Sequence, residues 1–174
     1  MSFRRGVRLG VDVGSVRVGL AVCDPDGMIA SPVETLRRDT ARRTDVARIA
    51  AEVVERGAIE VVLGMPRSLS GAEGPAARAA VAYAEQVATA VAPVPVRMVD
   101  ERLTTVSAHR ALHDAGRRGR RHREVVDQVA AVLVLQSAID AEHVSGTPAG
   151  TLIGSSPQDV MSQDGTSQDG AARG

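Results

Sequence analysis

The chain has 174 residues, 44% of them hydrophobic, and its 21 basic and 21 acidic residues give a formal net charge of zero. This length suits one domain, and the only aromatic residues, Phe3 and Tyr83, nearly exclude nucleic-acid binding by base stacking. The single Cys23 excludes an intramolecular disulfide framework, and the sequence has no membrane-spanning run and no signal-peptide core, so we expect a soluble, cytoplasmic protein.

The predicted elements begin with three strands. Apolar runs on either side of Gly14 and Ser15 predict an antiparallel hairpin, and a turn signal at residues 24–27 precedes a third strand over 28–36. Hydrophobic spacing then predicts, in order, a helix over 40–56, a strand over 59–63, a helix over 75–90, a strand over 94–99, and helices over 104–115 and 124–142. This order predicts an α/β fold, a five-stranded mixed sheet flanked by helices.

The composition changes near residue 145. Residues 145–174 are rich in Ser, Gly, Gln, Asp and Pro and repeat Ser-Gln-Asp-Gly, so we expect a disordered polar tail that follows a domain over residues 1–144. The tail holds three aspartates and one arginine, a net charge of −2, so residues 1–144 carry +2.

An acid interrupts the first apolar run. Asp12 lies inside a predicted buried strand, where removing its carboxylate from water is costly without a compensating partner. A divalent cation is such a partner; the alternative is an aspartate that caps the turn through its own backbone. Right-handed crossovers bring the fifth strand near the first, so we expect Asp12 to meet Asp100 and Glu101 at the edge where such sheets bind ligands.

A further acid lies on the last predicted helix. Asp127 has Ala130, Ala131 and Val134 at helical spacing, which predicts a position near the face that packs on the sheet; the alternative is a first-turn acid stabilised by the helix dipole. Carboxylates without cysteine or paired histidine ligands favour Mg²⁺ or Mn²⁺ over zinc. The predicted catalytic and metal-binding residues are Asp12, Glu101 and Asp127.

Arginines predict the substrate class. A loop before the last helix carries Arg117, Arg118, Arg120, Arg121 and Arg123. Beside a metal site this cluster predicts a phosphodiester substrate; the alternative is a solvated run of charges. The other predicted substrate-binding residues are Gly14, Ser15, Arg17, Arg67, Ser68 and Arg102. Gly14 and Ser15 could instead form an ordinary turn, and Arg17 could be an outward-facing strand residue. Arg67 and Ser68 could be structural loop residues, and Arg102 could form an ion pair with Asp100.

Four segments together resemble a known family. Residues 9–22, 62–71, 99–108 and 126–131 are similar to motifs of the YqgF family of RNase H-like proteins. Its members are named as pre-16S rRNA nucleases and, formerly, as Holliday junction resolvases. The resemblance spans roughly residues 7–142. It implies the RNase H-like fold, a divalent-metal requirement, and active-site acids at Asp12, Glu101 and Asp127.

One departure concerns the number of ligands. Junction resolvases of the related RuvC type have a second acid one helical turn after the helix aspartate, where this chain has Ala130. A fourth ligand would come from Glu124 or Asp100, or be absent.

The main functional hypothesis is a metal-dependent endonuclease that acts on structured RNA. The implied substrate is pre-16S rRNA, with the small-subunit precursor as its partner. The alternatives are a resolvase of four-way DNA junctions and a non-catalytic, ribosome-associated RNA-binding factor. A nucleotide-binding hairpin of the actin-like ATPase type is disfavoured, because the predicted domain is too short for the two lobes that such proteins need.

Overall fold

The computed structural model describes residues 3–66, 74–100 and 120–154, with the backbone alone over 120–126. The strands are β1 (Arg8–Val13), β2 (Arg17–Cys23), β3 (Ala30–Arg37), β4 (Glu60–Met65), β5 (Val96–Asp100) and β6 (Thr151–Leu152). The helices are α1 (Thr44–Arg56), α2 (Pro75–Val91) and α4 (Arg120–Ser145). No helix in the described part of the chain is both long and apolar enough to cross a membrane.

The six strands form one mixed sheet in the order β3-β2-β1-β4-β5-β6. β1, β2 and β3 make an antiparallel meander, β4 and β5 run parallel to β1, and β6 returns antiparallel to β5. This confirms the predicted mixed sheet and places β4 beside β1 as predicted, whereas β5 pairs with β4 and is separated from β1 by it. The helix predicted over residues 104–115 lies outside the described residues.

The strand count is a correction, since the sequence predicted five strands. β6 has only two residues, and they lie inside the segment predicted to be a disordered tail. A strand this short has no hydrophobic alternation to detect, and it is held by backbone pairing of Leu152 with Arg97 and of Thr151 with Met98. The remaining predicted tail, residues 155–174, lies outside the described residues.

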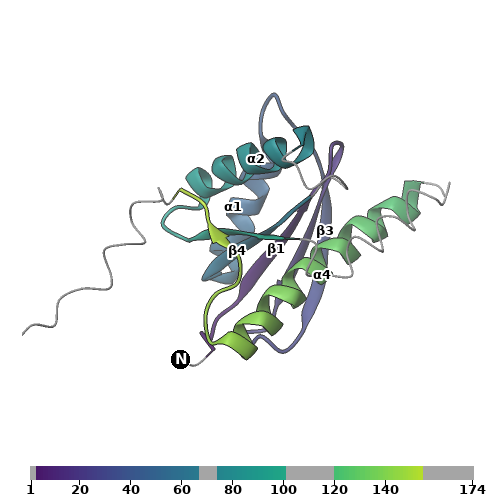
Figure 1. The fold of residues 1–174 in the computed structure, drawn as a ribbon. Helices are drawn as coiled ribbons and strands as arrows, with labels where there is room; N and C mark the ends of the chain where they lie inside the picture. The colour runs from purple at the N-terminus through teal and green to yellow at the C-terminus, as the bar shows by residue number, and fades with distance from the viewer. Residues whose placement is uncertain (1–2, 67–73, 101–119, 155–174) are drawn as a thin grey trace, which may run out of the picture.

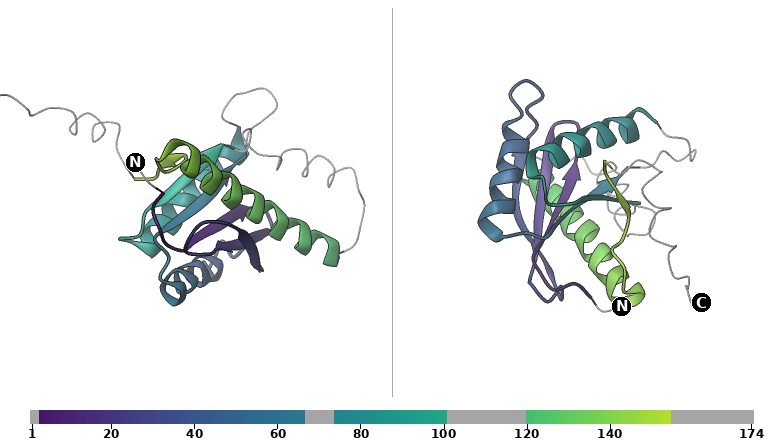
Figure 2. Two further views of the ribbon diagram at one scale, coloured as in Figure 1. Left: turned by 90° about the horizontal axis from the view of Figure 1, so that it is seen from below. Right: turned by 90° about the vertical axis from the view of Figure 1, so that its left-hand side faces the viewer.

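Helices cover the sheet on both faces. Figure 1 and the two turned views of Figure 2 show α1 and α2 on one side and α4 crossing the other. Alternation along β1 explains the division, because successive side chains point to opposite faces. Leu9 and Val11 join the core under α1 and α2, whereas Gly10 faces α4.

Small residues let α4 approach the sheet closely. A Cβ atom added at Gly10 would lie 2.7 Å from the Cβ of Leu135, and one added at Gly19 would lie 2.0 Å from the backbone oxygen of Asp127. Ala21 and Ala131, both fully buried, continue this interface. The absence of side chains at Gly10 of β1 and Gly19 of β2 therefore sets how closely α4 approaches the sheet, including the N-terminal half where Asp127 lies.

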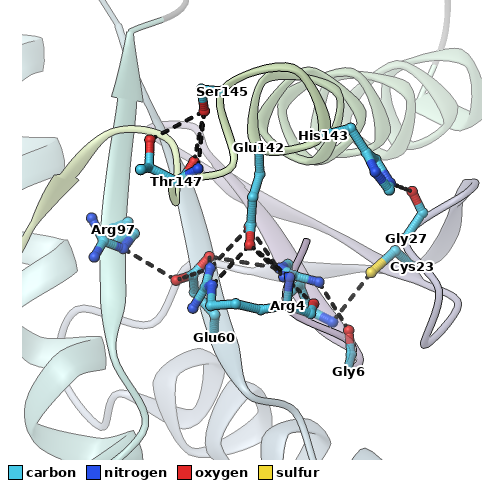
Figure 3. A network of polar contacts seen from close by, with 11 residues as sticks. Arg4, Gly6, Cys23, Gly27, Glu60, Arg97, Glu142, His143, Ser145 and Thr147 are labelled. Carbon is cyan, nitrogen blue, oxygen red and sulfur yellow. Dashed lines mark hydrogen bonds and ion pairs between the residues drawn. The ribbon is translucent and has the colours of Figure 1, made fainter. Parts of the chain in front are cut away.

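A buried ion network fixes the other end of α4 (Figure 3). The guanidinium of Arg8, on β1, donates to Glu142 Oε2 at 3.1 Å, and Arg4 Nε donates to Glu142 Oε1 at 2.8 Å. Glu60, at the start of β4, accepts from Arg4 at 3.0 Å and from Arg97 at 3.1 Å. Hydrogen bonds that Arg4 donates to Glu142 raise the pKa of Arg4 despite its partial burial. The network ties α4 to three strands at the sheet end opposite Asp12.

A second buried group supports the turn between β1 and β2. The Tyr83 hydroxyl on α2 donates to Asp45 Oδ2 on α1 at 3.0 Å, and the Arg38 guanidinium lies 4.4 Å from the centre of the Tyr83 ring. Arg38 also donates to the Gly14 oxygen at 3.5 Å. Burial, followed by the Asp45 charge, raises the pKa of Tyr83. The turn that follows Asp12 is thus connected to both helices of this face.

Replacing Tyr83 by phenylalanine is expected to lower the free energy of unfolding by about 1–3 kcal/mol, because a buried carboxylate loses its donor. Asp45 is only 3% exposed, and its Oδ1 has no hydrogen-bond partner among the described residues. Urea unfolding tests this, with Val54→Ala on the exposed face of α1 as the control. Equal stability of wild type and Tyr83→Phe would show that the hydroxyl does not stabilise Asp45.

Candidate active site

Asp12 is a buried acid at the carboxyl end of a central strand. It is the penultimate residue of β1 and is 3% exposed. It pairs in register with Gly19 of β2 and, by alternation with Gly10, lies on the face covered by α4. The predicted location of this acid within a buried strand is confirmed.

Asp127 reaches the same place from α4. Its backbone oxygen lies against Gly19, the residue opposite Asp12, so the close approach of α4 brings the two acids together. Arg17 of β2 donates from Nε to Asp127 Oδ2 at 2.8 Å, and both side chains are about three-quarters buried, at 22% and 24% exposure. Asp127 therefore lies at the rim of the helix–sheet interface, near the packed face as the sequence predicted.

The partner of Arg17 is a finding that sequence reasoning missed. Arg17 was predicted to contact the substrate or to face outward, yet its guanidinium holds the Asp127 carboxylate. Alternation along β2 was the available signal, because Arg17 and Gly19 share a face and Gly19 had to lie under the last helix if Asp12 did. Arg17 thus holds the Asp127 carboxylate at the start of β2.

Gly14 and Ser15 form the turn that directly follows the strand bearing Asp12. The Gly14 N–H donates to the Arg17 oxygen at 2.8 Å, and Ser15 and Val16 are exposed. The turn therefore presents a solvent-accessible edge beside the two acids. This position agrees with the predicted role of Gly14 and Ser15 in substrate binding and does not test that role.

Several predicted site residues cannot be placed. Glu101, Arg67, Ser68, Arg102, Arg117 and Arg118 lie outside the described residues, and Arg120, Arg121 and Arg123 are described by backbone alone, in the first turns of α4. Asp100 ends β5 opposite Met65, two strands from β1, and Glu101 follows it in the chain. Asp12 and Asp127 are the members of the predicted acidic triad that the structure brings together.

The donors present fit a hard divalent cation. Asp12 is nearly inaccessible to water at the end of β1, and the Asp127 backbone packs on Gly19, the residue opposite it. Carboxylate oxygens are the ligands that Mg²⁺ and Mn²⁺ prefer. Among the described residues no group of three His, Cys, Asp or Glu side chains is arranged to hold a metal. The predicted third ligand, Glu101, is not among those residues.

Adding a methyl group at Gly19 is expected to separate the acids. The Cβ atom of Gly19→Ala would overlap the Asp127 backbone, so α4 must shift, at a cost of about 1–3 kcal/mol in the free energy of unfolding. Urea unfolding tests this, and an unchanged free energy of unfolding would refute the close packing described here.

These features define a class of protein. An antiparallel meander continued on one side by parallel strands, with an acid on β1 facing an acid on a helix that crosses the sheet, is the RNase H-like arrangement. A family model described as “RuvX: Holliday junction resolvase” matches residues 6–141. The chain belongs to this RuvX (YqgF) family.

Curated relatives agree with this assignment. A protein of Kineococcus radiotolerans is 60% identical over 151 residues, which cover 87% of this chain and 80% of that protein. A protein of a Nocardioides species is 52% identical over 152 residues, which cover 86% of this chain and 97% of that protein. Both are named “Putative pre-16S rRNA nuclease”.

Among solved structures, T. thermophilus RuvC in complex with a Holliday junction substrate overlaps 83% of this chain and 99% of its own, with 17% sequence identity and a TM-score of 0.47. The overlap is weak, and the family assignment does not depend on it.

Proposed function

We propose that this protein is a divalent-metal-dependent endonuclease of the cytoplasm that hydrolyses phosphodiester bonds in structured RNA, and that it matures the 5′ end of pre-16S rRNA. The observation that carries the proposal is the convergence of buried Asp12 with Asp127 at the carboxyl end of β1. The names of the curated relatives support the nuclease activity and the RNA substrate.

The acids and Arg17 would have different roles in the site. Asp12, Asp127 and Glu101 would hold Mg²⁺ or Mn²⁺; when bound, the cation supplies positive charge that favours a hydroxide nucleophile and stabilises the charge of the transition state. Arg17 positions Asp127 by donating a charged hydrogen bond to Oδ2.

The turn beside the acids would position the scissile strand. Gly14 and Ser15 give the backbone of a nucleic acid close access to the end of β1, because Ser15 is exposed and Gly14 carries no side chain. The other residues predicted from the sequence to bind the substrate are Arg67, Ser68, Arg102, Arg117, Arg118, Arg120, Arg121 and Arg123. Guanidinium groups suit phosphate because their planar donors bind two oxygens at once.

A cleavage assay tests the proposal directly. End-labelled RNA that carries the 5′ precursor of 16S rRNA is incubated beside a four-way DNA junction with Mg²⁺ or Mn²⁺, using wild type and Asp127→Asn. The matched control is Asp140→Asn, which alters an exposed acid on the same helix. We expect the RNA to be cut by wild type and Asp140→Asn and not by Asp127→Asn. RNA cleavage that survives in Asp127→Asn would overturn the site assignment.

A junction resolvase is the second candidate, because the matching family model carries that description. Cutting of the four-way junction alone would support it, and would also require two sites brought together on a symmetric substrate. Specific RNA binding without cleavage under either metal would instead favour a non-catalytic ribosome-associated factor.

A further inference from the structure

Among the arginines whose side chains the structure describes, two groups differ in their contacts. Carboxylates pair with Arg4, Arg5, Arg8, Arg17, Arg38, Arg48, Arg56 and Arg97. Arg37, Arg42 and Arg43, by contrast, are exposed, and their side chains make no ion pair or hydrogen bond with any residue of the described chain. All three lie in one short segment, the end of β3 and the turn that leads to α1.

This segment adjoins the candidate active site. Arg37 pairs in register with Arg17, which holds Asp127, so Arg37 lies one strand further out on the same face. The Arg38 N–H donates to the Val16 oxygen at 2.9 Å, which joins the turn after β3 to the turn after β1. Figure 1 shows both turns at the upper end of the molecule.

The acids of the segment are already engaged. Asp39 accepts the Arg42 N–H at 2.9 Å and the Thr44 hydroxyl at 2.7 Å; the Arg42 bond, then the Thr44 bond, lower its pKa. Asp45 is buried against Tyr83 and Arg38. Residues 37–45 contain four arginines and two aspartates, a net charge of +2. Neither aspartate forms an ion pair with Arg37, Arg42 or Arg43. Arg37 and Arg42 line a shallow hollow between β3 and α1, and Arg43, next in the chain, lines a neighbouring hollow between α1 and α2.

We propose that Arg37, Arg42 and Arg43 form a phosphate-binding track that holds the backbone of the substrate as it leaves the acidic site. The proposal rests on the proposed nuclease function and extends its binding surface beyond the residues assigned above. Exposed arginines without carboxylate partners bind phosphate without first breaking an ion pair. Contacts of this kind give affinity that depends on salt and is nearly independent of sequence.

Arg43 offers an unusually clean test variant. It is the non-glycine residue with a positive φ in the described chain, at 54°, a conformation that costs an ordinary side chain energy and glycine almost none. Its backbone bonds, from its N–H to the Asp39 oxygen and from Ala47 N–H to its own oxygen, survive substitution by glycine. Arg43→Gly thus removes a charge without straining the turn, so lost binding cannot be ascribed to misfolding.

The experiment measures RNA affinity as a function of salt. The probe is the 16S precursor RNA, and Asp12→Asn is the parent protein so that no cleavage occurs. Into this parent we place Arg37→Ala, Arg42→Ala and Arg43→Gly, singly and together. The control is Arg5→Ala, which removes an exposed arginine paired with Asp26 near the other end of the sheet.

We expect the triple variant to bind about 10-fold or more weakly near physiological salt, with the slope of log affinity against log salt reduced by roughly 2. Each single variant should account for part of the change, and Arg5→Ala for none. A triple variant with the affinity and salt slope of the parent would overturn the proposed track. So would a parent protein that binds an acidic protein in a salt-dependent way but does not bind the RNA.

Failure of the track is distinguishable from failure of the nuclease assignment. Binding in the Asp12→Asn parent does not depend on cleavage, so an inactive wild type that still shows the arginine-dependent slope would refute catalysis and retain the track. If the wild type cleaves RNA but the triple variant has the same RNA affinity and KM, the track is refuted and the nuclease assignment is retained.

Discussion

Replacing Asp12 by asparagine is expected to lower the cleavage rate by about 10³-fold or more while leaving the protein folded. The carboxylate is 3% exposed at the point where β1 meets α4, and cation-held charge at a transition state is worth several kcal/mol. Asparagine has nearly the same shape and keeps one oxygen, but it removes the negative charge that a divalent cation requires.

The measurement is the initial rate of RNA cleavage at saturating metal, with unfolding curves recorded on the same samples. Asp140→Asn, the exposed acid of α4, should match wild type in rate. A rate for Asp12→Asn within a few-fold of wild type would contradict the assignment, whatever the effect on stability. If Asp12→Asn loses activity because it unfolds, Asp127→Asn is the informative variant, because the Asp127 side chain is partly exposed.

The largest expected effect on stability is at the other end of α4. Glu142→Gln should lower the free energy of unfolding by about 3 kcal/mol or more, because it removes the nearest partner of a buried charge and leaves Arg8 with Glu60 at 3.8 Å. Arg8 is 1% exposed and Glu142 2%, with 3.1 Å between Arg8 Nη2 and Glu142 Oε2. Glu55→Gln, at an exposed acid 3.7 Å from its arginine, should change stability by no more than about 0.5 kcal/mol.

The same pair predicts a pH dependence. Burial raises the pKa of Glu142, but hydrogen bonds from Arg4 and the charge of Arg8 outweigh it, so the pKa lies below its ordinary value of 4.5. A lowered pKa stabilises the folded state above that ordinary value, and this stabilisation is lost as the pH falls through the lowered pKa. The stability difference between wild type and Glu142→Gln should therefore shrink in acid. A difference that stays constant to about pH 3 would contradict the assigned pairing.

Sequence reasoning worked best where a local signal was strong. The Gly-containing turn gave the hairpin, and Gly57, with a φ of 57°, ends α1 where its predicted end lay. Pro75 opens α2 at the predicted position. The start of α1 was less accurate, at residue 40 instead of Thr44, because Asp39 organises an extra turn before the helix begins.

Contacts between distant segments were harder to predict. The position of Asp12 followed from a charge in an apolar run, but its meeting with Asp127 depends on Gly19, whose missing side chain acquires meaning only once α4 lies over it. The ion pair of Arg17 with Asp127 and the network around Glu142 join residues far apart in the chain. Arginines in such pairs cannot be told from surface arginines by pattern, because both occur as isolated charges among apolar residues.

The central claim is that Asp12 and Asp127 hold a divalent cation together. Titration of Mn²⁺ followed by electron paramagnetic resonance tests it most directly, with wild type, Asp12→Asn, Asp127→Asn and Asp140→Asn compared in the presence of the precursor RNA. We predict that wild type and Asp140→Asn remove free Mn²⁺ from solution equally, and that both site variants bind markedly less. Equal Mn²⁺ binding by all four proteins would contradict the site described here.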